Sequence, residues 1–176
     1  MERRRSQSSV ARDCIVTALI ELMKQQAYES ISITDVCDRA GVSRMTYYRN
    51  YSSKEEVLET YIKEMGAEIA RAVDAAHIGD RQLYFRLLFE RLGSYSDVGL
   101  IAHKANLGGM VLRGVTEYMM STFSELASTE EGALRAVCLA GAFYNLFITW
   151  VRGGKQESAD YLSRLMCSVT EGICQP

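Results

Sequence analysis

Proline is almost absent from this 176-residue sequence, in which the only one is the terminal Pro176. Proline breaks or kinks a helix because it lacks an amide proton and clashes with the preceding turn. A chain without internal helix breakers, in which apolar residues recur every three or four positions, is therefore predicted to be all-α. The length allows one sizeable or two small hydrophobic cores.

Residues that bind metals or perform catalysis are also scarce. There are two histidines and five cysteines, with no Cys-x-x-Cys pair, which argues against a zinc site. No Ser-His-Asp arrangement, paired carboxylates in an apolar run or glycine-rich phosphate loop is present. We therefore expect no enzyme, no catalytic residues, no metal and no cofactor. Three cysteines are expected to be buried thiols, namely Cys14, Cys37 and Cys138, while Cys167 and Cys174 are expected to be more accessible.

No apolar run approaches the roughly 20 residues that cross a bilayer. The basic residues after Met1 have no apolar segment behind them, so no secretory signal is expected. A cytoplasmic protein without a membrane partner is predicted.

The formal charge of −2 is unevenly distributed. Residues 1–54 contain nine basic and six acidic side chains, a net +3, whereas residues 55–176 contain eleven and sixteen, a net −5. A basic N-terminal part favours contact with a polyanion there, with the acidic remainder facing away.

The stretch Thr34–Lys54 has the pattern of two short helices joined by a tight turn. Thr34 is expected to cap the first helix. Gly41 supplies the left-handed conformation that ends that helix at little cost. Ser43 is expected to cap the second helix, which runs to about Asn50. The pattern predicts a helix-turn-helix whose second helix can enter a DNA major groove.

The second helix carries donors suited to nucleic acid. Base reading is assigned to Arg44, Met45 and Thr46, because arginine pairs with guanine and threonine bonds a base or touches a thymine methyl. Phosphate contacts are assigned to four residues, namely Thr34, Tyr48, Arg49 and Lys54. The capping Ser43 is also predicted to be a DNA-binding residue. Tyr47 and Tyr51 are predicted to point inward and to pack the small domain. Residues 1–9 are predicted to form a basic arm, and residues 10–26 the first long helix. Within the arm, Arg3, Arg4 and Arg5 are either part of a frayed tail or a contact to phosphates and the minor groove.

These residues also resemble a known family. The run Ala40-Gly41-Val42-Ser43, then Thr46, Tyr48, Tyr51 and Lys54-Glu55, is similar to the DNA-binding domain of tetracycline-repressor (TetR) regulators over about residues 10–65. Tyr47 stands where the family has an aliphatic residue, Asn50 where it has histidine or tyrosine, and Tyr51 where it has phenylalanine. The resemblance implies a homodimer that binds double-stranded DNA at a near-palindromic operator.

The rest of the chain is predicted to form further helices. A helix with a Ser53–Glu56 capping box is predicted from Lys54 to about Ala76. Others are predicted over 81–92, 110–127, 130–151 and 159–173, with an irregular stretch over 93–107. The predicted domains are a DNA-binding domain, residues 1–53, and a helical dimerisation and effector domain, residues 54–176, joined by the long helix.

The last two helices are strongly apolar, which favours a subunit interface over an ordinary core. Interface candidates are Val137, Gly141, Tyr144, Leu162, Met166 and Val169. The C-terminal end also resembles domains of a Gram-positive branch of the family, which implies that two helices per subunit pair as a four-helix bundle.

The family resemblance further implies a repressor that a small-molecule effector releases, with a cavity for that effector, which is expected to be small and apolar. Candidate lining residues are Met65, Tyr84, Leu88, Met110, Tyr118, Tyr144, Phe147 and Trp150. Methionine and aromatic side chains suit such a pocket, but the same spacing is typical of a packed, ligand-free core. Three alternatives stay open: a regulator with such a core, a ligand-binding module with a degenerate DNA-binding domain, and an activator in place of a repressor.

Overall fold

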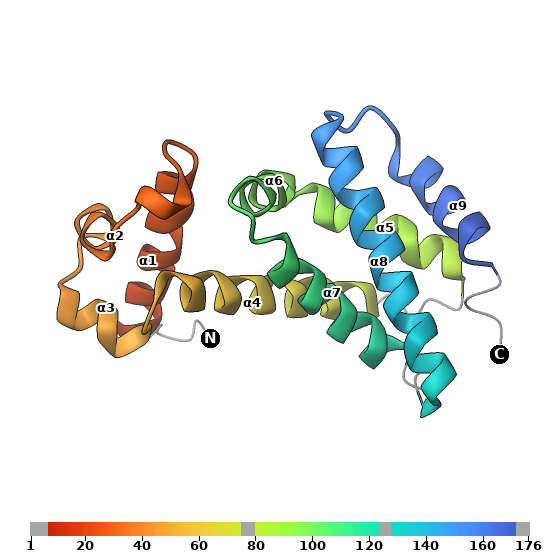
Figure 1. Ribbon diagram of the computed structural model, residues 1–176, viewed down its shortest axis with the longest axis horizontal. Coiled ribbons are helices and arrows are strands. Elements are labelled where there is room, and N and C mark those ends of the chain that lie inside the picture. Colours follow the sequence, from red (N-terminus) through yellow and green to blue (C-terminus); the bar gives the residue numbers. More distant parts are fainter. Residues whose placement is uncertain (1–6, 75–79, 124–127, 172–176) are drawn as a thin grey trace, which may run out of the picture. The chain divides into compact units, whose positions relative to one another are not determined.

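The computed structural model describes residues 7–74, 80–123 and 128–171 (Figure 1). Within these ranges the chain is helical and contains no strand, so the all-α prediction is confirmed. The elements are α1 (Gln7–Met23), the 3-10 turn η1 (Tyr28–Ser30), α2 (Ile33–Ala40), α3 (Arg44–Asn50), α4 (Lys54–Asp74), α5 (Arg81–Gly93), α6 (Ser96–Lys104), α7 (Gly108–Thr122), α8 (Glu130–Arg152) and α9 (Ala159–Val169).

The chain divides into two compact units, residues 1–63 and 64–176. The division falls inside α4, so this helix contributes residues to both units. The predicted arm residues Arg3, Arg4 and Arg5 lie outside the described part of the chain. Helix α1 begins at Gln7, so residues 7–9, expected to belong to the arm, are helical.

The first unit packs α1 against α2 and α3. Ile15 and Leu19 on α1 are fully covered, as are Val36 on α2 and Tyr47 on α3. Tyr51 is also buried, which confirms that both tyrosines point inward. This small core fixes which face of α3 is left for solvent.

Two helix caps differ from those predicted. Ser32, not Thr34, caps α2, and its hydroxyl and the Asp35 carboxylate form a reciprocal capping box. Thr34 is therefore the second residue of the helix. At α4 the Ser53 hydroxyl accepts from the Glu56 amide at 3.1 Å as predicted, but the Glu56 carboxylate accepts from the amide and hydroxyl of Ser52 instead of closing on Ser53. Sequence spacing could not separate neighbouring serines that offer the same chemistry.

The second unit packs α5 against α9 and α7 against α8. Its core is rich in aromatic side chains: the rings of Phe89 and Phe143 lie 4.9 Å apart, and those of Phe89 and Trp150 lie 6.0 Å apart. The expected irregular stretch over 93–107 is wrong, because residues 96–104 form α6, which packs against α7 and α8. Glycine and serine residues near its start had obscured a short helix, because these residue types are more typical of turns.

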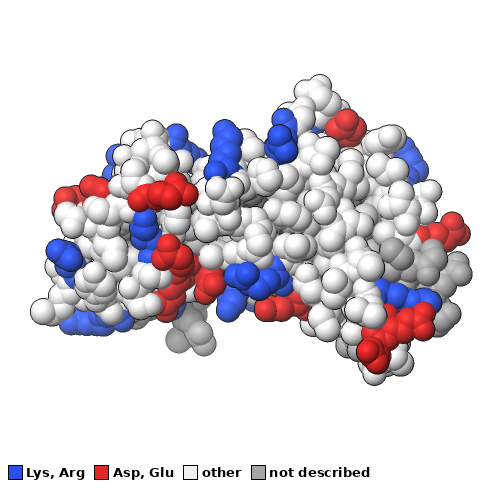
Figure 2. Space-filling model, in the orientation of Figure 1, with Lys and Arg blue, Asp and Glu red and all other residues white. Residues whose placement is uncertain are grey.

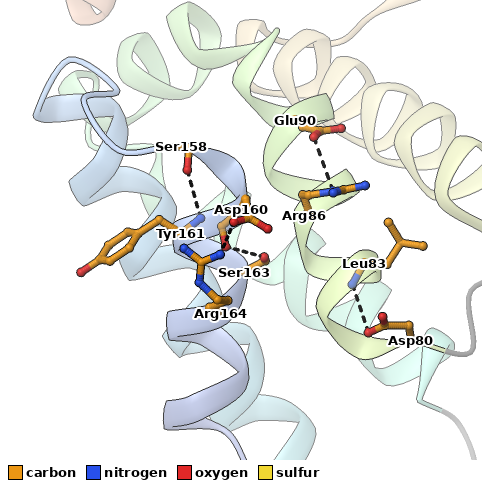
Figure 3. A network of polar contacts seen from close by, with 9 residues as sticks. All are labelled: Asp80, Leu83, Arg86, Glu90, Ser158, Asp160, Tyr161, Ser163 and Arg164. Carbon is orange, nitrogen blue, oxygen red and sulfur yellow. Dashed lines mark hydrogen bonds and ion pairs between the residues drawn. The ribbon is translucent and has the colours of Figure 1, made fainter.

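The polar contacts drawn on α5 and α9 each join residues of one helix, or that helix and its N-cap (Figure 3). Asp80 accepts from the Leu83 amide at the start of α5, and Ser158 accepts from the Tyr161 amide at the start of α9. Along α9 the Arg164 guanidinium pairs with Asp160, one turn earlier. These contacts, drawn in Figure 3, cap and support each helix, while apolar side chains fill the space between α5 and α9.

Several expectations about burial change. Cys14 and Cys138 are exposed, whereas Cys37 is buried as predicted. Helix α8 is long and apolar enough, by length and composition alone, to cross a bilayer, contrary to the expectation from the sequence. Half of its most apolar window is buried within the chain, as in the core helix of a globular unit.

Candidate nucleic-acid interface

The turn between α2 and α3 is built as the sequence predicts. Gly41 adopts a left-handed conformation with φ of 65°, and its amide closes onto the end of α2. Ser43 then caps α3, because its hydroxyl accepts from the Thr46 amide at 3.1 Å. The two caps fix where α3 begins and which of its residues face outward.

Helix α3 has one buried and one open face. Tyr47 is completely covered, while Met45 is 73% exposed and Tyr48 is 50% exposed. The guanidinium-bearing Arg44 and Arg49 are exposed as well. Figure 2 shows basic side chains along the edge of the first unit where α3 lies. The open face thus offers cationic, phenolic and apolar groups within two turns of one helix.

Thr46 is less free than its neighbours. Its hydroxyl lies 3.0 Å from that of Ser43, and its carbonyl accepts from the Asn50 side-chain amide at 2.8 Å. Thr46 is half-buried, so it offers a smaller surface than Arg44 or Met45. Asn50, which stands in place of the family's histidine or tyrosine, donates this hydrogen bond from its side chain to the backbone of its own helix.

Arg12 is a functional candidate that the sequence reasoning missed. Its guanidinium carbon lies 5.4 Å from the centre of the Tyr51 ring, which follows α3. A cation over an aromatic face is attracted by the ring quadrupole. The contact links α1 to the residue that follows α3. Sequence patterns could not reveal it, because the two residues lie 39 positions apart.

The phenol of Tyr47 is an unusual group in this core. Its hydroxyl is buried and has no hydrogen-bond partner among the described residues. Burial, followed by the nearby Cys37, raises the pKa of Tyr47 to about 12, so the phenol stays neutral. A buried polar group without a partner reduces stability because its hydration is lost without replacement.

We therefore expect Tyr47→Phe to raise the stability of the first unit by up to about 1 kcal/mol while leaving DNA binding unchanged. Hydrogen exchange of α1 and α3 amides measures this for the unit alone. The matched control is Tyr28→Phe, which removes a phenol that donates to Glu55 at 2.7 Å and should lower stability by about 1 kcal/mol. Equal losses in both variants would contradict the assignment.

Lys54 stands at the first position of α4, and its ammonium points into the unit. It donates to the carbonyl oxygens of Tyr28, at 2.9 Å, and Ile31, and lies 4.5 Å from the centre of the Tyr28 ring. The predicted phosphate-binding ammonium is thus already engaged within the chain. Thr34 is exposed on the first turn of α2.

Tyr28 is also held by Glu55. Its hydroxyl donates to the carboxylate, and this bond is the main cause that lowers the pKa of Glu55. A carboxyl with a lowered folded-state pKa stabilises the fold above its unfolded pKa and loses that contribution as the pH falls through the folded pKa. The contact is therefore present at neutral pH and weakens in acid.

Comparison with known proteins supports the interpretation of the first unit as a DNA-binding domain. Residues 15–61 match the family model described as bacterial regulatory proteins, tetR family. An uncharacterized HTH-type transcriptional regulator, YxbF of Bacillus subtilis (strain 168), is 34% identical over 59 residues. The matched stretch covers 33% of this chain and 16% of that relative, so the likeness concerns only a part of each protein.

Solved structures share the fold of the whole chain. Lin0861 from Listeria innocua has a TM-score of 0.82 at 18% identity, covering 98% of this chain and 96% of that one. A protein from Syntrophomonas wolfei assigned to the TetR family has a TM-score of 0.69 at 15% identity, covering 95% and 96%. Residues 15–61, which include the helix-turn-helix, thus match the tetR family of bacterial regulatory proteins, and the rest of the chain shares the fold of solved structures from that family.

Proposed function

We propose that the chain is a homodimeric, sequence-specific DNA-binding transcription regulator, acting in the cytoplasm as a repressor that a small effector releases. The family is one of transcriptional regulators and not of enzymes. The observation that carries the proposal is the open face of α3, presented by a helix whose other face is anchored through the buried Tyr47. That arrangement exposes side chains for a groove while keeping the backbone fixed.

In this proposal, Arg44, Met45 and Thr46 read bases, and Tyr48, Arg49 and Thr34 hold phosphates. Arg44 can pair with a guanine edge, and the exposed Met45 can touch a thymine methyl. The smaller surface of Thr46 favours a single contact. Two copies of α3 would read half-sites about 34–36 Å apart, or a larger spacing set by the dimer.

Arg44→Ala should cost about 1–3 kcal/mol at one operator position and relax base preference there. Arg49→Ala is the matched control: it should weaken all sequences alike and reduce the salt dependence of binding. The operator is first selected from random duplexes with the wild-type protein, and each variant is then titrated against every single-base change. A wild type that enriches no sequence would contradict the proposed function.

Dimerisation is proposed through α8 and α9. Exposed apolar side chains lie on α8 at Leu134 and Val137 and on α9 at Tyr161, Leu165 and Val169. Spacings of three and four residues place each set along one side of its helix. Such stripes mark surfaces that a second copy can cover.

Not all the predicted interface residues lie on this surface. Leu162 and Met166 are buried in the core of the second unit, where α9 packs against α5. A side chain that its own chain already covers has no area left for a partner. Gly141 borders open space, since a Cβ there would meet no atom within 4 Å, and Tyr144 is half-buried.

The core of the second unit contains four of the eight candidate lining residues for an effector. Among the candidate lining residues, Tyr84, Leu88, Phe147 and Trp150 are buried in the apolar cluster of the second unit. This burial favours the alternative of a packed, ligand-free core. Met65, Tyr118 and Tyr144 pack only partly against the cluster, and Met110 is half-buried.

One polar pair gives an effector something to recognise. The Tyr84 hydroxyl donates to that of Tyr118 at 3.0 Å; Tyr84 belongs to the apolar cluster, and Tyr118 packs against it. A small, mostly apolar molecule with one polar group would suit these neighbours. A thermal-shift screen of apolar metabolites, repeated with operator DNA, tests this. A ligand that stabilises the protein and releases DNA supports gating, because it must bind the two states differently.

A further inference from the structure

Two residues in the first turn of α4 form hydrogen bonds with the segment that leads into the helix-turn-helix. Lys54 donates to the carbonyls of Tyr28 and Ile31, and its ammonium lies over the Tyr28 ring. The adjacent Glu55 accepts from the other end of the same tyrosine, its hydroxyl, at 2.7 Å. These four residues, Tyr28, Ile31, Lys54 and Glu55, are called the Tyr28 clasp below.

The clasp closes next to the start of α2. Ile31, whose carbonyl accepts from Lys54, directly precedes Ser32, the residue that caps α2. The ammonium of Lys54 also helps to lower the pKa of Asp35, the acidic partner in that capping box, after the larger effect of the Ser32 hydrogen bonds. Lys54 therefore acts on the entry to the hairpin that carries α3.

This geometry conflicts with a phosphate contact. A lysine ammonium has three donors, and two of them are directed at carbonyls within the unit. The side chain is half-buried, and the ring of Tyr28 covers another side of the ammonium. To reach a phosphate, Lys54 would have to leave both carbonyls and the aromatic face without replacement.

We propose that Lys54 is a positioning residue, which sets the orientation of α2 and α3 through the Tyr28 clasp and does not itself hold DNA phosphate. This inference rests on the proposed DNA-binding function. It assigns the cationic contacts with phosphate to exposed side chains such as Arg49. It also explains why two neighbouring residues of opposite charge are both turned toward a single tyrosine.

Salt dependence separates the two roles. Each phosphate contact adds about 0.9 to the slope of log affinity against log salt on duplex DNA. The probe is a fluorescein-labelled duplex of mixed sequence, titrated with the full-length protein at several salt concentrations. Lys54→Met should leave the slope per protomer unchanged, whereas the control Arg49→Ala should reduce it by about 0.9. A slope reduced by Lys54→Met as much as by Arg49→Ala would overturn the proposal.

A second readout distinguishes positioning from simple stability. On a duplex selected with the wild type, Lys54→Met should lose about tenfold or more of its preference over mixed-sequence DNA while circular dichroism shows it folded. Hydrogen exchange over residues 28–35 should rise at the same time. An unchanged preference together with unchanged exchange would also overturn the proposal.

Glu55→Met covers the case in which Lys54→Met does not fold, because methionine removes both the charge and the oxygen that accepts from Tyr28. A carboxylate cannot hold a phosphate, and removing its charge should strengthen non-specific binding by reducing repulsion. If the clasp positions α3, the variant should nevertheless lose sequence preference and show faster exchange over residues 28–35. Retained preference and exchange would overturn the clasp. A wild type without any DNA affinity would refute the proposed function instead, while the exchange data would still report on the clasp.

Discussion

Gly141→Leu should convert the proposed dimer into a monomer without unfolding the chain. Within one copy a Cβ at position 141 meets no neighbouring atom within 4 Å, and leucine favours a helix by about 1 kcal/mol over glycine. In a four-helix interface built from α8 and α9, the same side chain would keep two helices apart. DNA affinity should fall by about 100-fold or more, because two linked recognition helices bind far more tightly than one. Sedimentation velocity and anisotropy on the selected duplex measure both effects.

Two further variants separate loss of the interface from loss of the fold. Val137→Glu places a charge on the exposed side of α8 and should also give a folded monomer. Leu162→Glu places the charge in the core, where the side chain is 2% exposed, and should unfold the second unit instead. A wild type that sediments as a monomer at micromolar concentration, or a Gly141→Leu variant that stays dimeric, would contradict the proposed interface.

Phe143→Ala should lower the free energy of unfolding of the second unit by about 3–5 kcal/mol. Phe143 is 2% exposed, and its ring lies 4.9 Å from that of Phe89 and 6.2 Å from that of Phe85. Truncation removes the contacts of a whole ring and leaves a cavity that helices α5 and α8 cannot close. Urea denaturation followed by circular dichroism measures the loss.

The matched control is Val137→Ala on the same helix, which shortens an exposed side chain and should change stability by less than about 0.5 kcal/mol. Comparable losses in the two variants would show that Phe143 is not a central part of the core.

Much of the first unit could be predicted from the sequence, because its signals are local. The left-handed Gly41, the Ser43 cap and the inward Tyr47 each follow from residue type within a few positions. The choice of Ser32 over Thr34 as the cap of α2 could not, since both hydroxyls precede suitable amides. It depends on Asp35 closing the reciprocal bond.

The role of Lys54 shows where sequence reasoning ends. A lysine next to a recognition hairpin has the chemistry of a phosphate contact, and nothing within a few residues contradicts that. Its partners, Tyr28 and Ile31, lie more than 20 positions earlier and offer backbone carbonyls, which leave no mark in the sequence. The same holds for Leu162 and Met166, because an apolar stripe on α9 does not state whether α5 or a second copy covers it.

Trp150 is the only tryptophan in the sequence, and it lies in the second unit. Its ring is buried against Phe89, and its indole N–H donates to the Glu157 carbonyl at 2.9 Å. Excitation at the red edge of aromatic absorption, where tyrosine does not absorb, therefore gives emission from one defined place. The native protein thus has a built-in optical probe of the second unit, and the ten tyrosines supply a separate, mixed signal from both units.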